Sequence, residues 1–166
     1  PPENMRTIII IISILLVNPI VLLSQENQAF VAENYITKNF DVAIFPKTYI
    51  EMLPDNRFTP TKSQVEQAEL ALRTNLKSLN SKKINQISTP IIDKRLKKYR
   101  RQYFGYIDEN GEEILIINAF WKSRENKKEI WLNEYIRVLD GGSFYWEIKY
   151  NLTKGKLFDL MVNGYA

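Results

Sequence analysis

Polar and apolar positions between residues 61 and 79 repeat with the period of an α-helix. The apolar positions recur at spacings of three and four: Val65, Ala68, Leu72, Leu76 and Leu79. Two overlapping capping boxes begin this stretch, Thr61 with Gln64 and Ser63 with Glu66. The pattern predicts one amphipathic helix. A shorter second helix is expected to begin at Thr89-Pro90.

From Tyr99 onward the pattern changes to the alternation that is typical of strands. Segments 99–107 and 113–121, joined around Asn110-Gly111, predict an antiparallel hairpin with a two-residue turn. Segment 131–138 matches the apolar face of 144–151 across Asp140-Gly141-Gly142, with a three-residue loop between them. This match predicts a second hairpin.

A third hairpin is predicted at the turn Thr153-Lys154-Gly155. A three-residue loop pairs the apolar residues of the two arms: Trp146 with Val162, Ile148 with Leu160, and Tyr150 with Phe158. The fold class is therefore α+β, with one main helix packed on a four- to five-stranded antiparallel meander.

The residues before 61 are less regular. Phe40 to Phe45 predicts a short strand that Pro46 ends. We divide the chain into an N-terminal extension and leader at 1–24, an extended or partly ordered segment at 25–60, and a helix-plus-sheet domain at 61–166.

A long helix followed by a four-stranded meander resembles the cystatin-like architecture, and more loosely the cone-shaped NTF2-like one. The resemblance covers residues 61–163 and concerns topology, which implies a fold rather than an activity. Cystatin-type protease inhibitors carry a Q-x-V-x-G loop. The nearest stretch here, Gln102 to Gly105, is one residue shorter and falls within a predicted strand, so protease inhibition is not carried over.

Residues 7–23 form an apolar run that is broken near its end by Asn18-Pro19 and is followed by Ser24. Together with Arg6 this run has the parts of a secretory signal peptide, and we expect cleavage after Ser24. An uncleaved signal anchor and a buried core helix are the alternatives. The first two place the remaining chain across the membrane, in the periplasm or outside the cell.

The 166 residues include no Cys and no His, with 23 Lys and Arg against 19 Asp and Glu. Disulfides, thiolate nucleophiles and imidazole bases are therefore excluded. An enzyme would depend on carboxylate, Tyr or Lys chemistry, or on a cation held by oxygen ligands. We expect neither a cofactor nor a metal site.

The sheet face opposite the helix is the first candidate surface. Its aromatic and polar members, on the predicted register, are Trp131, Tyr135, Arg137, Tyr145, Glu147, Lys149 and Met161. Lys149 falls opposite Asp159, and Tyr135 opposite Glu147. Such a mixture suits a partner or ligand, and equally a solvated face with cross-strand pairs.

Glu134 is placed by the same register on the helix-facing side, near Ile148. A buried acid there would have a raised pKa and could act as a general acid or base. A position at the sheet margin, paired with a basic residue, is the alternative.

Residues 82–101 contain eight basic residues and one acid. The cations that a membrane-facing patch would use are Lys94, Arg95, Lys97, Lys98, Arg100 and Arg101. Anionic lipid or acidic glycan is the expected partner, and nucleic acid is not expected for an exported domain. A solvated stretch that protects a strand edge is the alternative.

These features favour an exported, non-enzymatic binding or scaffold module that uses the aromatic and polar face, with an unknown protein or envelope component as partner. One alternative is an NTF2-like small-ligand enzyme with Glu134 or Glu147 in its pocket. The other is binding of an anionic membrane surface through residues 82–101.

Overall fold

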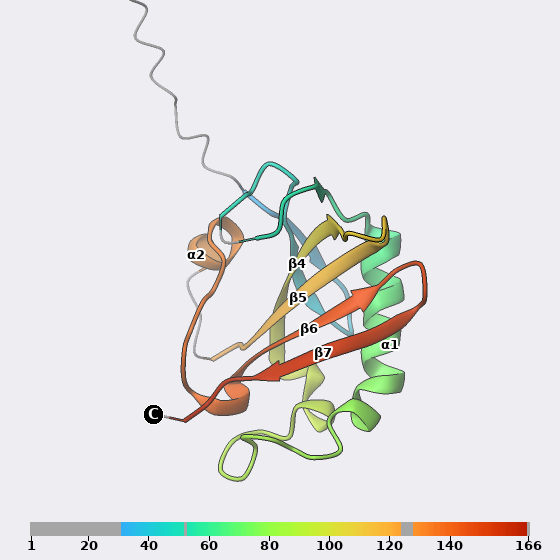
Figure 1. Ribbon diagram of the computed structural model, residues 1–166. Helices are drawn as coiled ribbons and strands as arrows, with labels where there is room; N and C mark the ends of the chain where they lie inside the picture. The colour runs from blue at the N-terminus through green and yellow to red at the C-terminus, as the bar shows by residue number, and fades with distance from the viewer. Residues whose placement is uncertain (1–30, 52, 124–127, 166) are drawn as a thin grey trace, which may run out of the picture.

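The structure is a computed structural model that describes residues 31–51, 53–123 and 128–165 (Figure 1). The predicted leader lies outside the described residues. Helix α1 (Lys62–Leu79) begins at the predicted capping box: the Gln64 amide donates to Thr61 Oγ1 at 3.2 Å, and the Thr61 amide donates to Gln64 Oε1 at 2.9 Å. The apolar face is buried up to Leu76, whereas Leu79 is partly exposed.

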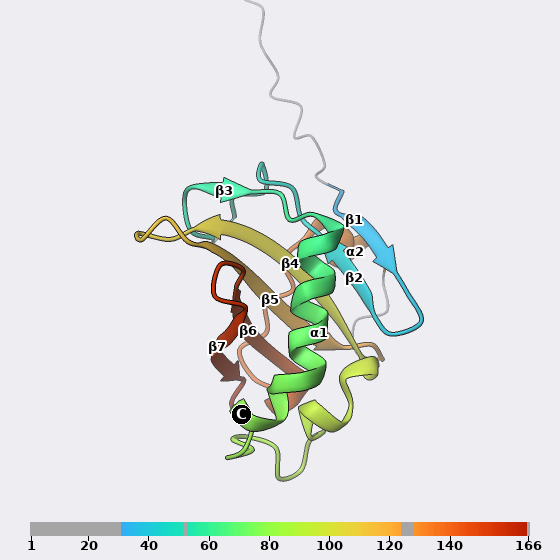
Figure 2. The same cartoon turned by 90° about the vertical axis from the view of Figure 1, so that its right-hand side faces the viewer.

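The strands of the described chain form one seven-stranded sheet with α1 across one of its faces (Figures 1 and 2). The strands are β1 (Glu33–Ile36), β2 (Asp41–Ile44), β3 (Arg57–Phe58), β4 (Tyr99–Ile107), β5 (Glu113–Trp121), β6 (Tyr145–Asn151) and β7 (Lys156–Val162). Their order is β1-β2-β4-β5-β6-β7, and β3 pairs with β4 beyond the end of β2. All pairs are antiparallel except β2 with β4. The α+β class is confirmed, and the strand count exceeds the prediction.

Strands before residue 61 account for the larger sheet. The predicted strand 40–45 is present as β2, and β1 and β3 join it within the segment expected to be extended or partly ordered. The second predicted helix is reduced to two short 3₁₀ turns, η1 (Ile92–Lys94) and η2 (Leu96–Lys98).

Strands β4 and β5 have the predicted bounds, but their turn is longer than predicted. The Gly111 amide donates to the Asp108 carbonyl at 3.0 Å, and the Asp108 amide donates to the Glu112 carbonyl at 3.0 Å. Gly111 has a φ of 77°, a conformation that glycine adopts without steric cost. The connection therefore has three residues between Asp108 and Glu112 instead of two.

The register of β6 and β7 is correct at one end only. Trp146 pairs with Val162 as predicted, whereas Tyr150 pairs with Leu157 and not with Phe158. A bulge in β7 separates the two registers, and Asp159 lies there with a φ of 50°. One extra residue in the bulge is compensated by a loop of four residues instead of three.

The predicted strand 131–138 is wrong. Residues Lys128–Asn133 form the short helix α2, and the chain continues from it without strand pairing until η3 (Gly142–Phe144). Consequently β6 pairs directly with β5, and the hairpin around Gly141 does not form.

Two buried amides of the sheet hold this segment in place of a neighbouring strand. Gln102 Nε2 donates to the Trp131 carbonyl at 2.8 Å, and its Oε1 accepts from the Ile136 amide at 2.9 Å. Asn118 Nδ2 donates to the Ile136 carbonyl at 2.7 Å and to Gln102 Oε1 at 2.9 Å. The alternating apolar residues of 131–138 therefore cover the sheet instead of extending it.

The sheet consequently has a buried cluster on each face. The α1 side includes Leu72, Leu76, Tyr103, Ile117 and Ile148. The other side includes Phe45, Phe104, Phe120, Trp131 and Tyr145. Neither face of the central strands is left flat and open.

Candidate functional site

Two residues of the predicted aromatic face are part of the second cluster. Trp131 is 1% exposed and Tyr145 is also buried. The Arg100 guanidinium lies 5.0 Å from the centre of the Trp131 ring. The Trp131 ring is therefore not available to a partner, whereas Tyr145 contributes to the lining of a surface pocket.

Four other residues of that face come together at its margin. Tyr135, Arg137, Glu147 and Met161 line a surface pocket of about 330 Å³. Tyr135 donates to Glu147 Oε2 at 2.6 Å, which is the predicted pair reached from a loop and not from a strand. Burial and this carboxylate raise the pKa of Tyr135.

The predicted pair of Lys149 and Asp159 is present, with Nζ 3.0 Å from Oδ2. Burial lowers the pKa of Lys149, and the hydrogen bond to Asp159 together with nearby acidic groups more than offsets this, so that the pKa is raised. Because the pair is solvated, it is typical of cross-strand pairing on a sheet surface.

Glu134 does not lie between the helix and the sheet. It follows α2 on the opposite side, is exposed, and lines a separate surface pocket with Tyr49, Glu51 and Tyr135. The prediction fails because it depended on the strand register of 131–138.

The acid that does lie between helix and sheet is Glu69. Its carboxylate receives Arg101 Nε at 2.5 Å, Arg101 Nη2 at 3.0 Å and the Tyr103 hydroxyl at 2.8 Å. Burial lowers the pKa of Arg101, but Glu69 more than offsets it, so that the pKa lies above its ordinary value. Burial, followed by the nearby Glu69 charge, raises the pKa of Tyr103.

Arg100 and Arg101 therefore do not belong to an exposed basic patch. Arg101 is 1% exposed and its remaining guanidinium nitrogen donates to the Leu96 carbonyl at 2.9 Å. Arg100 points to the other face, where it forms an ion pair with Asp41 at 3.0 Å. Adjacent residues of β4 point to opposite faces, which separates these two arginines.

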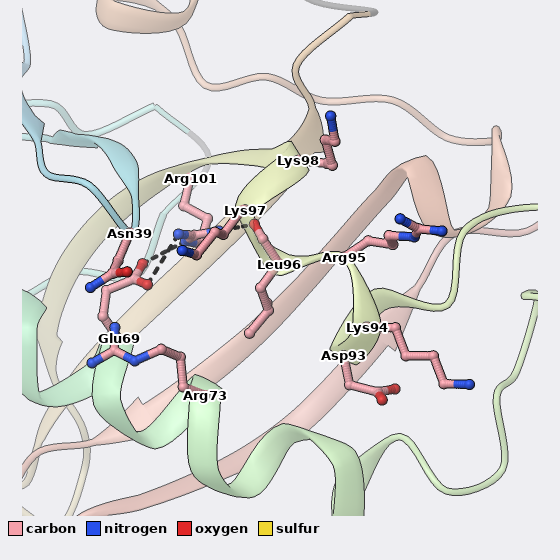
Figure 3. Close-up of a pocket in the computed structure, with 10 residues that line it drawn as sticks. All are labelled: Asn39, Glu69, Arg73, Asp93, Lys94, Arg95, Leu96, Lys97, Lys98 and Arg101. Atoms are coloured by element: carbon pink, nitrogen blue, oxygen red, sulfur yellow. Dashed lines mark hydrogen bonds and ion pairs between the residues drawn. The ribbon is translucent and has the colours of Figure 1, made fainter.

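The other four predicted cations gather at a pocket. Lys94, Arg95, Lys97 and Lys98 line a cavity of about 480 Å³ together with Arg73 of α1 (Figure 3). We call these five residues the basic pocket. The rest of the cavity lining includes two acids, and consists of Asn39, Glu69, Asp93, Leu96 and Arg101. Within the described chain, none of the five side chains of the basic pocket has an ion pair or a hydrogen bond. Figure 3 shows the Glu69–Arg101 pair on one side, with Lys94 and Arg95 extending away from it.

The basic pocket adjoins a loop, residues 81–89, that connects α1 to η1. Asn80, which caps the end of α1, and Gln86 of the loop are buried and bond to each other twice, at 2.9 and 2.6 Å. Asn80 also donates to Asp93 Oδ1 at 2.6 Å. Lys82 and Lys83 are exposed on the loop. Both lysines line a separate, smaller pocket of about 150 Å³ near the end of α1, with Ile84, Leu160 and Val162.

The sequence contained signals for some of these features. Glu69 falls within the apolar stripe between Val65 and Leu72, and Arg101 alternates with Tyr99 and Tyr103. The helical spacing around Glu69 and the strand alternation around Arg101 were therefore signals that both side chains are buried. Arg73 carried no such signal, because an exposed arginine on a helix is ordinary.

No helix in residues 31–51, 53–123 and 128–165 combines the length and the apolar character that crossing a bilayer requires. The same residues contain no group of three or more acidic side chains placed to hold a metal ion. Comparison with protein-family models, with curated proteins and with solved structures gives no match.

Proposed function

We propose that this protein is an exported, non-enzymatic binding module whose ligand is an anionic group on a glycan or a lipid. One observation supports this most directly. The five cations of the basic pocket line one cavity, and none of them forms an ion pair with an acid among the described residues.

Unpaired cations in one place repel each other, so the fold is expected to lose stability by gathering them. A phosphate, sulfate or carboxylate ligand removes this repulsion and accepts charge-assisted hydrogen bonds from Lys and Arg. The buried Glu69–Arg101 pair does not take part, since the Arg101 donors are already used. The ligand therefore meets flexible, solvated cations, which suits an anionic surface better than one rigid small molecule.

The pocket beside Glu147 supports a second proposal. Tyr135, Arg137, Glu147 and Met161 combine apolar and polar groups in one small pocket, which suits either a protein partner or a small ligand. The alternative function, an NTF2-like enzyme, would use this pocket as its active site and Glu147 as its general acid or base. This alternative predicts that a small ligand raises the melting temperature of the protein, and that Glu147→Gln abolishes this stabilisation.

Export and a cystatin-like scaffold complete the proposal. One long helix across a mainly antiparallel sheet supports the scaffold, although β2 is parallel to β4. Export is tested by N-terminal sequencing of the chain from its native host. Sequencing that begins after Ser24 supports a cleaved leader; retention of residues 7–23 indicates an anchor.

Ligand binding is tested on immobilised heparin, a sulfated glycan. We expect Lys94→Glu/Arg95→Glu to weaken retention at low salt by at least about tenfold. The control is Lys47→Glu/Lys156→Glu, which changes the net charge equally at two exposed lysines outside the basic pocket. If both variants lost heparin retention equally, the net charge of the protein would explain the binding, and this result would contradict the proposed site.

A further inference from the structure

Around the loop 81–89, polar side chains are buried and apolar side chains are exposed, which is the reverse of the usual arrangement. Asn80 and Gln86 are buried, whereas Ile84 is 59% and Ile87 is 98% exposed. An isoleucine left in water forgoes the favourable free energy of apolar burial. The loop therefore leaves two apolar side chains, Ile84 and Ile87, exposed to water within one short segment.

Hydrogen bonds fix this arrangement. The Lys83 amide donates to the Asn80 carbonyl at 3.0 Å, the Gln86 amide donates to the Lys83 carbonyl at 3.2 Å, and Gln86 Oε1 accepts from the Ile92 amide at 3.0 Å. Lys83 and Asn85 have φ values of 45° and 55°, which cost energy for residues other than glycine.

The far end of the loop is also fastened. Thr89 Oγ1 donates to the Asn85 carbonyl at 2.8 Å and accepts from the Ser143 hydroxyl at 2.8 Å. Tyr165 donates to the same Asn85 carbonyl at 2.8 Å. With the backbone held at both ends, Ile87 stays almost fully exposed, and Ile84 stays more than half exposed beside Leu160 and Val162.

Cations flank this apolar tip. Lys82 and Lys83 precede Ile84, and Lys94 and Arg95 follow just beyond Ile92, all four without an internal acidic partner in the part of the chain that the structure describes. Protein–protein interfaces are depleted in lysine. A small apolar tip among lysines matches instead the boundary of an anionic bilayer, where isoleucine enters the acyl region and lysine meets phosphate.

We propose that loop 81–89 is a membrane-contacting element, which inserts Ile84 and Ile87 into the interface of an anionic bilayer. This inference rests on the proposed function, because the basic pocket supplies the electrostatic attraction, and it specifies lipid as the source of the anion. Each cation near the bilayer surface adds to the electrostatic attraction. The two isoleucines add an apolar contribution that salt does not screen.

The chain has no cysteine, so a single cysteine accepts a single label. The experiment attaches an environment-sensitive fluorophore to Ile87→Cys in the chain as recovered from its native host. The control carries the label at Ile50→Cys, which is 75% exposed between β2 and β3. Any leader is common to both proteins, so the comparison isolates the loop.

We expect a blue shift and quenching by lipid-borne quenchers at position 87, but not at position 50, with vesicles of phosphatidylglycerol and phosphatidylcholine. Vesicles of phosphatidylcholine alone are expected to give neither. In the unlabelled chain, Ile84→Ser/Ile87→Ser is expected to lower vesicle affinity about tenfold or more while heparin retention stays unchanged.

The two proposals fail in different ways. Heparin retention without a spectral change at position 87 overturns the membrane insertion and leaves anion binding intact. Loss of both overturns both. A blue shift on raising the protein concentration without lipid contradicts the insertion and assigns the loop to a second copy of the chain.

Discussion

The Arg101 guanidinium and the Glu69 carboxylate form a two-point ion pair between α1 and β4, with Nε–Oε1 and Nη2–Oε2 distances of 2.5 and 3.0 Å. Both side chains are almost fully buried. Such a pair contributes little over apolar residues of the same size, but breaking it leaves a charge without a counterion. The pair thus fixes how the helix lies on the sheet.

Glu69→Gln is expected to lower the free energy of unfolding by about 3–5 kcal/mol, because Arg101 stays charged in a buried site. The double variant Glu69→Leu/Arg101→Met is expected to cost less than the single one. Urea unfolding followed by circular dichroism measures both. As a control, Asp159→Asn breaks the solvated pair with Lys149 and is expected to cost less than about 1 kcal/mol.

The pH dependence of stability is expected to have an alkaline limb. Burial raises the pKa values of Tyr99, Tyr103 and Tyr135 above the ordinary value of 10.0. The folded chain then holds these protons more tightly than the unfolded chain. Their contribution is complete below about pH 10 and is lost as the pH rises toward the folded-state pKa values.

Tyr103→Phe tests this sign. The variant loses the bond to Glu69 and is expected to be less stable at neutral pH, but its melting temperature should fall less steeply above about pH 10. Thermal unfolding over that range, with tyrosinate absorbance as the second signal, measures the slope. Parallel slopes in the two proteins would contradict a raised pKa at Tyr103.

Asn80→Ala is expected to destabilise the protein by about 1–3 kcal/mol, because it leaves Gln86 and Asp93 without their shared amide partner. Amide hydrogen exchange is expected to accelerate in residues 82–89 more than in β4. Unchanged exchange in the loop would show that the amide network does not hold it.

Gly105→Ala is expected to displace β3. A Cβ at position 105 would lie 2.7 Å from the Phe58 ring, so the ring or the strand must move. We expect a loss of about 1–3 kcal/mol in urea unfolding. Gly164→Ala, which meets nothing within 4 Å, is the matched control, and Phe58→Leu in the Gly105→Ala background should recover part of the loss.

Local pattern predicted the elements whose partners are close in the chain. The capping box at Thr61, the buried stripe of α1 and the bounds of β4 and β5 follow from period and turn residues. Segment 131–138 has the same alternation as a strand, yet Gln102 and Asn118 bond its backbone over the sheet. The spacing of apolar residues is the same in a strand and in an irregular segment that packs over a sheet, so the sequence pattern does not distinguish the two.

The candidate sites show the same division. Pairing of Lys149 with Asp159 was predicted and is present although Lys149 faces Phe158 in the register, because Asp159 is the next residue. Tyr135 and Glu147 also pair as predicted, but Tyr135 reaches Glu147 from a loop and not from the predicted strand. Burial of Trp131 was missed, since it depends on the long-range position of α2. The alternation of side chains along β4 was enough to predict that Arg100 and Arg101 point to opposite faces of the sheet. Counting the charges of residues 82–101 together hid this difference, and the two arginines in fact pair with Asp41 and Glu69.

The parallel pairing of β2 and the short pairing of β3 together occupy one whole side of β4 from Arg101 to Tyr106. Without residues 31–58, β4 would be an edge strand of nine residues with Tyr103 and Phe104 beside unpaired amides, a template for intermolecular pairing. The N-terminal strands therefore protect the sheet against aggregation. A chain clipped near residue 60 is expected to self-associate before it loses its helix.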